Sequence, residues 1–413
     1  MDMSIGLMVV AVVVLTLSSA FSFRYREVGL YGAIVAIIFG FFASSSFHYG
    51  AFILAIGLIN LISLEALKSE IKGVDYGLVG LMCLVTLYIF NTNDLTMLLL
   101  ALVLVSVPTY ILVMLREGGA NVEIGMKYIV FMVLATILFL IGAVMLVYAS
   151  SLGGIFYVLG YVMLILGLSL EVGVAPLHEW VPDVFSSADP IPISIIASLA
   201  KIVPFVAAMR ILISTYNPSM ASIVVFTAFI AAISMLMGNI GALTSKEHAR
   251  VLAYSTVANM GYVLACMVAV IKPEYFYFAL TGGLLMLFAN ASGKIGFFNA
   301  IKAEGAYSPF MYILALSFIG VPPLMGFWGK LFILYSLVEV GYIWLAALLV
   351  LNSAISIPYY IRLGRELGVS WKATFTNLIV TLVTIITLIT IIPPDWFYEG
   401  MKVLSQTIGI VIP

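Results

Sequence analysis

The chain is poor in charged residues. Of its 413 residues only 9% are Asp, Glu, Lys or Arg, 64% are hydrophobic, and the mean hydropathy is +1.21. A water-soluble domain of this size could not cover its apolar side chains with so few charges. The shortage of charge therefore excludes a soluble globular protein and indicates that the chain lies in a lipid bilayer.

Reactive side chains are scarce as well. The two cysteines, Cys83 and Cys266, lie inside apolar segments without the spacing of metal ligands, and the three histidines are far apart. No glycine-rich nucleotide fingerprint follows a strand. We therefore expect no cofactor in this chain, so that any redox chemistry would belong to partner subunits. The net charge of −1, without a basic stretch, argues against nucleic acid as a partner.

Long apolar runs are what the chain has in abundance. Runs of about 18 to 25 residues recur along it, each long enough to cross about 30 Å of hydrocarbon as a helix. The short alternating strands of a lipid-exposed barrel are absent. Arginines follow the first run rather than precede it, which predicts a retained helix and not a signal peptide.

We predict an all-α integral membrane protein with about 14 transmembrane helices. The predicted ranges are 5–22, 28–47, 49–64, 76–91, 95–115, 127–149, 153–174, 192–213, 219–243, 250–271, 275–300, 309–335, 341–362 and 372–392.

Basic residues fall mostly in alternate loops. The loops after odd-numbered helices hold Arg24, Arg26, Lys68, Lys72, Arg116, Lys127, Lys246, Arg250, Lys302, Arg362, Arg365 and Lys372. The other loops and the two ends hold only Arg210, Lys272 and Lys402. Because Lys and Arg gather in cytoplasmic loops, we predict a multi-pass protein of the cell (cytoplasmic) membrane with both termini outside.

Two proline-containing segments resemble each other. Gly173–Leu177 reads GVAPL and leads to Trp180, and Gly320–Leu324 reads GVPPL and leads to Trp328. The predicted topology places the first on a helix running inward and the second on a helix running outward. Such a pair is typical of inverted repeats, whose broken helices flank an ion path at the midplane. The alternative is chance recurrence of a pattern that is common in membrane helices.

Several charged side chains fall inside the predicted helices. A charge at the centre of a lone helix costs about 2.5–3.5 kcal/mol, so each is expected to face water or a partner. Lys201 lies near mid-membrane, and Lys330 follows the Pro322-Pro323 break, where unpaired carbonyls and water can stabilise an ammonium group. Lys294 lies nearer the end of its helix and could instead extend to the interface.

Glu171 lies on the helix before Lys201, and the two helices are expected to be antiparallel neighbours. A Glu171–Lys201 pair would either neutralise two buried charges or form a proton-exchange step. The nearby segment 178–183 allows two interpretations as well. It is an interfacial turn with Trp180 at headgroup depth, or it presents His178 as a proton-uptake residue.

Four separated stretches resemble one protein family. They are Ala175–Asp183 (APLHEWVPD), Lys201, Arg250–Ser255 (RVLAYS) and Gly320–Lys330 (GVPPLMGFWGK). In order and spacing, from about residue 90 to 335, they resemble the antiporter-like subunits of respiratory complex I. The N-type subunit is the type they resemble most, and membrane-bound hydrogenase, sulfane reductase and Mrp antiporter subunits are similar too.

The resemblance implies two inverted five-helix repeats, each a half-channel, joined by a central polar axis. The chain would divide into a three-helix segment (1–75), a first half-channel (76–213), a second half-channel (219–362), and a C-terminal helix and tail (372–413). By position, Lys201 and Lys294 would belong to the axis and Lys330 to the exit half-channel. The matching motif residues are Pro176, His178, Trp180, Asp183, Arg250, Pro322 and Pro323.

The departures from the family pattern concern the first half-channel. Val103 stands where the family has a glutamate, although Ser106 and Pro108 of that pattern are present. Glu171 replaces the family's helix 7 lysine, and Asn290 replaces a helix 11 histidine. Either the Glu171–Lys201 pair substitutes with reversed placement, or this half no longer conducts.

The resemblance implies a proton-translocating subunit of a complex I-like electron-transfer complex. Its partners would be other membrane subunits, including homologous antiporter-like ones, and a peripheral redox module with iron–sulfur clusters. The alternatives are an Mrp-type sodium/proton antiporter subunit and a non-conducting structural or coupling subunit. The sequence leaves open whether the chain acts within an oxidoreductase.

The charge asymmetry of the loops generates a test of topology. Cysteine labelling from either side of the membrane should place loops 68–72 and 362–372 inside and both termini outside. Cytoplasmic accessibility of a C-terminal tag would contradict this orientation.

Overall fold

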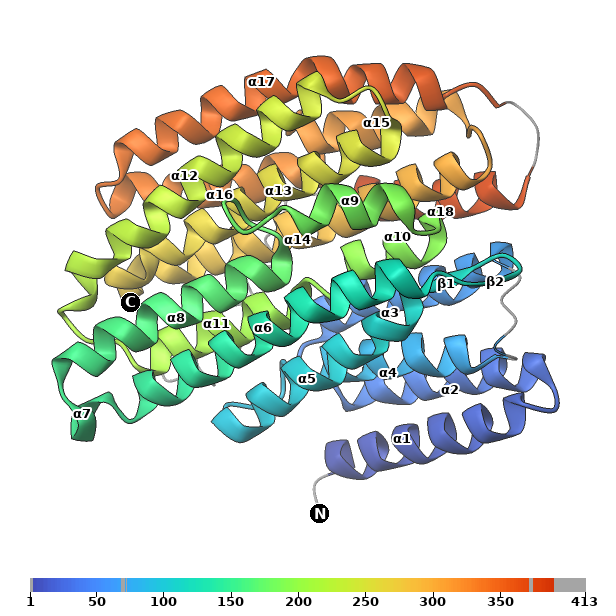
Figure 1. Ribbon diagram of the computed structural model, residues 1–413, viewed down its shortest axis with the longest axis horizontal. Coiled ribbons are helices and arrows are strands. Elements are labelled where there is room, and N and C mark those ends of the chain that lie inside the picture. Colours follow the sequence, from blue (N-terminus) through green and yellow to red (C-terminus); the bar gives the residue numbers. More distant parts are fainter. Residues whose placement is uncertain (1–2, 68–70, 72, 371–373, 390–413) are drawn as a thin grey trace.

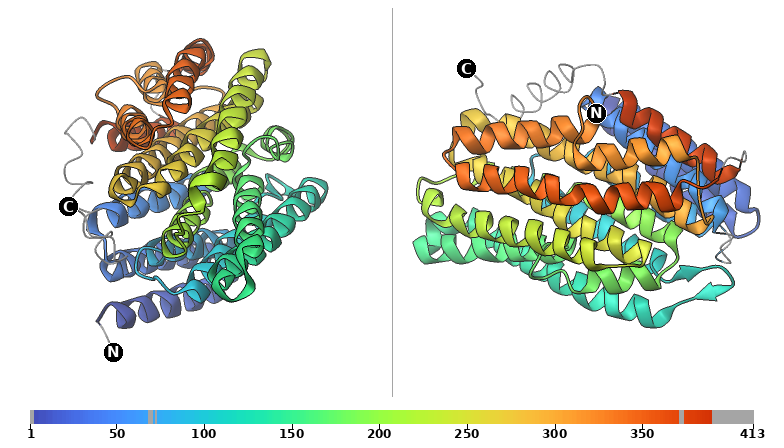
Figure 2. Two further views of the ribbon diagram at one scale, coloured as in Figure 1. Left: turned by 90° about the vertical axis from the view of Figure 1, so that its left-hand side faces the viewer. Right: turned by 90° about the horizontal axis from the view of Figure 1, so that it is seen from above.

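The computed structural model describes residues 3–67, 71, 73–370 and 374–389. Its long helices run side by side along the long axis of the molecule (Figures 1 and 2). In the described part, 11 helices are long and apolar enough to cross a membrane, and three shorter apolar helices accompany them. The all-α membrane fold is therefore confirmed, whereas the count of 14 spans stays a prediction. The predicted C-terminal tail lies outside the described residues.

The first half of the chain contains these elements: α1 Met3–Ser22, α2 Arg26–Ala43, α3 Phe47–Ser63, η1 Leu64–Ala66, α4 Val74–Tyr88, α5 Leu95–Leu112, β1 Leu115–Arg116, β2 Gly119–Ala120, α6 Val122–Val147, α7 Ala149–Leu152, α8 Gly154–Val172, α9 Trp180–Ser187, α10 Pro190–Ser198 and α11 Ile202–Ser214. The second half contains α12 Met220–Thr244, α13 His248–Cys266, η2 Met267–Ile271, α14 Pro273–Lys302, α15 Ser308–Ile319, α16 Met325–Glu339, α17 Ile343–Leu367 and α18 Phe375–Ile389.

Two helices are interrupted where the similar segments predict it. Gly173 ends α8 and Gly320 ends α15, each in the left-handed region with φ of 80° and 91°. Glycine adopts this conformation without the clash that a Cβ would make. In Figure 1, α8 begins at the left end of the bundle and α15 begins at the right, so the two broken helices run in opposite directions.

A third interruption separates α10 from α11. The predicted helix 192–213 is present as one apolar span, Pro190–Ser214, but a short turn divides it, because α10 ends at Ser198 and α11 begins at Ile202. Pro204 has no N–H to donate to the carbonyl of Ala200, and its ring crowds that carbonyl. Lys201 therefore lies in a break and not inside a regular helix.

Glycines allow the helices around the first break to pack closely. A Cβ added to Gly142 of α6 would lie 2.3 Å from the backbone nitrogen of Leu164 in α8. One added to Gly167 of α8 would lie 2.4 Å from the nitrogen of Phe139 in α6. Small residues let helices in lipid approach this closely, and these contacts hold α8 against α6.

Helix α3 packs against the long central helix α14 through aromatic rings. Phe288 of α14 stacks on Phe52 of α3, with ring centroids 5.1 Å apart, and on Tyr49 of α3 at 6.2 Å. All three side chains are buried. At the other end of α3, Asn60 donates to the hydroxyl of Ser198 at 3.0 Å, so this end lies beside the break between α10 and α11.

Ion pairs gather at one end of the bundle, where α6 and α13 begin and α14 ends. Asp183 of α9 pairs with Lys127 of α6 and, at 3.3 Å, with Arg250 of α13. Lys302 at the end of α14 pairs with Asp189 at 2.5 Å. We call this end the basic end, because it carries the basic loops that the sequence predicts to be cytoplasmic.

Candidate ion path

Three lysines are buried inside the bundle. Lys201, Lys294 and Lys330 are 2%, 0% and 6% exposed. Among the described residues, none of their ammonium groups forms a direct ion pair with a carboxylate. Instead, each donates hydrogen bonds to main-chain carbonyls and lies over the face of an aromatic ring. The three sites thus share one kind of environment.

The ammonium group of Lys201 lies at the end of the broken helix α8, and the residue itself belongs to the break between α10 and α11. Its Nζ donates to the main-chain oxygen of Glu171 at 3.1 Å and lies 4.8 Å from the ring centroid of Trp180. The last carbonyls of a helix have no partner within it and carry partial negative charge, so an ammonium group is favourable there. Trp180 is fully buried and donates to Leu170 at 3.0 Å. Its depth relative to the lipid headgroups stays a prediction.

Lys330 repeats this arrangement at the end of α15. Its Nζ donates to the carbonyl oxygens of Phe318 at 2.9 Å and Ile319 at 3.0 Å, and it lies 4.7 Å from the ring centroid of Tyr262. In both breaks, therefore, a buried lysine binds the carbonyl end of an interrupted helix and contacts a ring face.

Lys294 lies on the uninterrupted helix α14. It donates to the carbonyl oxygen of Leu252 at 2.5 Å and to the hydroxyl of Ser255. Its Nζ is 5.2 Å from the ring centroid of Phe318, the residue whose carbonyl oxygen binds Lys330. Because Lys294 is fully buried, the interpretation that its side chain extends to the interface is wrong. Phe318 joins its surroundings to those of Lys330.

Asn290 lies between Lys201 and Lys294. It stands one helical turn before Lys294 on α14, and its amide nitrogen donates to the carbonyl of Ala197 in α10 at 3.1 Å. Its amide oxygen is buried without a partner. A buried polar atom of this kind is a site where an ordered water is expected. Polar atoms therefore continue from one lysine toward the next.

Glu171 is held by Ser106, which belongs to the family pattern in which Val103 replaces a glutamate. Its carboxylate accepts a hydrogen bond from Ser106 of α5 at 2.5 Å, while its second oxygen, Oε2, is buried without a partner. Ser106 lies one turn after Val103. The structure thus brings Glu171 and Lys201 together, but the ammonium contacts the main-chain oxygen of Glu171 and not its carboxylate.

His178 and the motif prolines lie at the surface of the breaks. The Nδ1 atom of His178 is 3.3 Å from the carbonyl oxygen of Pro176, and the ring is partly exposed. Pro176, Pro322 and Pro323 are all exposed. His178 makes no contact with the three lysines, and its role in proton uptake stays a prediction.

Asp183 and Arg250 form an ion pair with each other and with none of the three buried lysines. Their ion pair ties α9 of the first predicted repeat to α13 of the second.

Sequence reasoning named Asn290 and the motif that ends at Ser255, but it did not predict what they contact, and it missed Tyr262. Which lysine each of them meets depends on which helices become neighbours, and the sequence carries no local signal for that. In the part of the chain that the structure describes, no three His, Cys, Asp or Glu side chains are grouped to hold a metal ion.

The sequence matches a known family over most of its length. Residues 92–356 match the family described as "NADH:quinone oxidoreductase/Mrp antiporter, TM". NADH-quinone oxidoreductase subunit N of Thiobacillus denitrificans is 32% identical over 70% of this chain. The match covers 65% of that relative, so the chain spans about two thirds of its length.

Solved structures share the fold. A chain of respiratory complex I from Thermus thermophilus with bound NADH superposes with a TM-score of 0.81 at 19% identity, covering 97% of this chain and 98% of that one. A chain of the Mrp complex from Dietzia gives 0.79 at 15% identity, covering 99% and 99%. A chain of the membrane-bound sulfane sulfur reductase, an archaeal respiratory membrane complex, gives 0.79 at 18% identity, covering 98% and 99%.

The chain that carries these buried lysines thus matches one family in sequence and shares its fold with solved structures. As the resemblance of the four motifs predicted, the chain belongs to the NADH:quinone oxidoreductase/Mrp antiporter transmembrane family.

Proposed function

We propose that the chain is a proton-translocating subunit of a multisubunit, complex I-like electron-transfer complex. Its family supports ion transport, and its relatives are subunits of multisubunit complexes. The observation that carries the proposal is the series Lys201, Lys294 and Lys330, in which buried ammonium groups are held by carbonyls and not by carboxylates.

The kind of partner matters for the chemistry. A lysine paired with a carboxylate is held in its charged form, because the opposite full charge is adjacent. Carbonyl dipoles and ring faces stabilise an ammonium group less, so the approach of a second positive charge can drive its proton onward. Three such lysines in series can pass positive charge through the bundle, each loading as its neighbour empties. A redox module in partner subunits would supply the driving force.

Glu171 is the group we assign to charge exchange with Lys201 in the first half of the path. Glu171 belongs to the last turn of α8, its carboxylate oxygen Oε2 has no partner, and its main-chain carbonyl binds the ammonium group of Lys201. This arrangement supports a reversed version of the family's pair, in which the carboxylate is on α8 because Val103 on α5 cannot provide one. The scaffold alternative rests on Val103 alone.

An Mrp-type antiporter subunit is the second candidate, and the fold match to the Mrp complex favours it equally. The composition of the purified native complex separates the two. Co-purified flavin or iron–sulfur proteins would identify an electron-transfer complex, whereas small cation-antiporter subunits would identify an exchanger. We further propose a location in the cell membrane, with both termini outside.

Lys330 provides the first test. Lys330→Met keeps the length and apolar stem of the side chain but removes the titrating group. We predict that the complex assembles, that electron transfer continues, and that fewer protons move per electron. The measurement is proton uptake against electron flux in vesicles that contain the intact complex.

Lys272→Met is the matched control. Lys272 also donates to a helix-end carbonyl, that of Glu339 at 2.6 Å, and lies near the ring of Tyr275, but it is exposed. An unaltered proton-to-electron ratio in assembled Lys330→Met would contradict the proposed role.

The proximity of Glu171 and Lys201 provides the second test. Removing one of two neighbouring buried charges leaves the other uncompensated, at a cost of about 3–5 kcal/mol for a direct pair and less for this indirect one. We therefore expect Glu171→Gln or Lys201→Met alone to reduce the amount of assembled complex more than the double variant does. If the losses of the single variants simply add in the double variant, the two groups are not coupled.

A further inference from the structure

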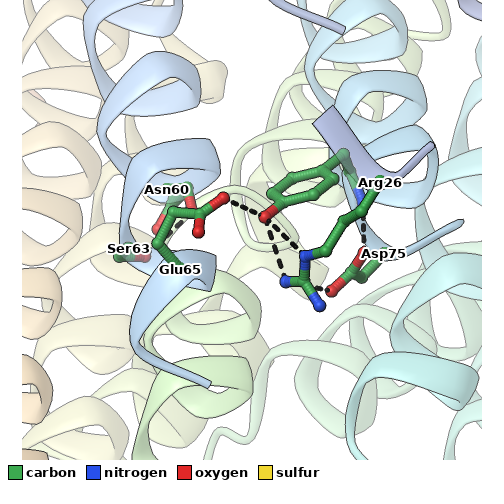
Figure 3. Close-up of polar contacts among 6 residues, drawn as sticks. Arg26, Asn60, Ser63, Glu65 and Asp75 are labelled. Carbon is green, nitrogen blue, oxygen red and sulfur yellow. Dashed lines mark hydrogen bonds and ion pairs between the residues drawn. The ribbon is translucent and has the colours of Figure 1, made fainter. Parts of the chain in front are cut away.

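A second group of charged side chains lies outside the series of lysines, among the N-terminal helices (Figure 3). Arg26 of α2 donates to the hydroxyl oxygen of Tyr76 in α4, at 3.1 Å from Nε and 3.0 Å from Nη2, and pairs with Asp75 at 3.5 Å. The Tyr76 hydroxyl donates in turn to the carboxylate of Glu65 in η1. These four residues form what we call the N-terminal cluster.

The N-terminal cluster extends from the surface into the protein. Glu65 is exposed, the Arg26 side chain is 28% exposed, and the side chain of Asp75 is fully buried. Burial of a carboxylate is unfavourable without strong compensation. The cluster lies at the basic end, the end predicted to face the cytoplasm, so Glu65 is placed to exchange protons with water there.

Polar groups continue from the N-terminal cluster toward Lys201. Ser63 and Asn60, in the last turn of α3, are both fully buried and lie next to Glu65 in Figure 3. The Ser63 hydroxyl donates to the carbonyl of Asn60 at 2.9 Å, and the Asn60 amide nitrogen donates to the hydroxyl of Ser198 at 3.0 Å. Ser198 is the last residue of α10, and Lys201 follows it in the break.

One polar atom of Asn60 forms no hydrogen bond. Its amide oxygen is buried and has no partner. Buried polar atoms are normally satisfied by protein or by water, so this atom marks a place for a water molecule between Glu65 and the break. A lone surface ion pair would need no buried amide or hydroxyl groups behind it.

We infer that Glu65, Asn60 and Ser198 form a proton-uptake route to Lys201 through the N-terminal helices. Val103 stands where the family has a glutamate, and the route through Glu65 would replace the one that this glutamate would serve. The inference rests on the proposed function. A proton from the aqueous phase binds a carboxylate oxygen of Glu65, passes through water at the Asn60 amide oxygen and the Ser198 hydroxyl, and reaches the neutral amine of Lys201. Lys201 has then given its own proton toward Lys294. Arg26 positions the Tyr76 hydroxyl, which orients the Glu65 carboxylate.

The test uses two conservative variants in the intact complex. Glu65→Gln keeps an acceptor for Tyr76 and thus the contact between η1 and α4, but it cannot carry a proton as a carboxylate does. Ser198→Ala removes one hydroxyl at the other end of the route. The matched control is Glu27→Gln, because Glu27 is an exposed carboxylate in the first turn of α2, beside Arg26. Proton uptake is followed with a pH-sensitive dye in vesicles and is expressed per electron and per assembled complex.

We expect both variants to lose proton uptake to the level of Lys330→Met, while Glu27→Gln keeps the wild-type ratio. If Glu65→Gln or Ser198→Ala keeps the wild-type ratio while Lys330→Met lowers it, the route is overturned and the proposed function stands. If Lys330→Met also keeps the wild-type ratio, the proposed function itself fails.

Discussion

The cost of keeping ammonium groups in the membrane interior is the constraint on which this structure depends. A charge at the centre of a lone helix is unfavourable by about 2.5–3.5 kcal/mol even on the insertion scale. The chain meets that cost by interrupting helices, since each interruption exposes carbonyl oxygens that have no partner within the helix. Glycines with positive φ after α8 and α15 create two such sites, and a lysine binds at each.

The remainder of the bundle keeps these interruptions in place. Glycine contacts hold the broken helix α8 against α6. Phe318 connects the surroundings of Lys294 and Lys330, because its ring lies under one ammonium group and its carbonyl binds the other. At the basic end, Asp183 joins helices from both predicted repeats. A rigid frame thus holds a few weakly compensated charges, which is the arrangement a charge-transfer path requires.

The sequence was sufficient to predict what depends on local pattern. Apolar runs gave the membrane helices, the two GVxPL segments gave two of the three breaks, and motif spacing gave the family. It was insufficient where a partner is a main-chain atom of another helix. The break at Lys201 follows from Pro204, a signal that was present but was not used. The full burial of Lys294 and Trp180, and the contact between Ser106 and Glu171, depend on packing between distant helices and have no local signature.

The central claim is that the buried lysines lie on one hydrated path. A structure of the intact complex at a resolution that shows ordered water tests it most directly. The account predicts water molecules bound at the partnerless oxygens of Glu171 and Asn290, and continuing between Lys201, Lys294 and Lys330. Dry apolar packing around these atoms, with the three lysines separated by closely packed side chains, would contradict it.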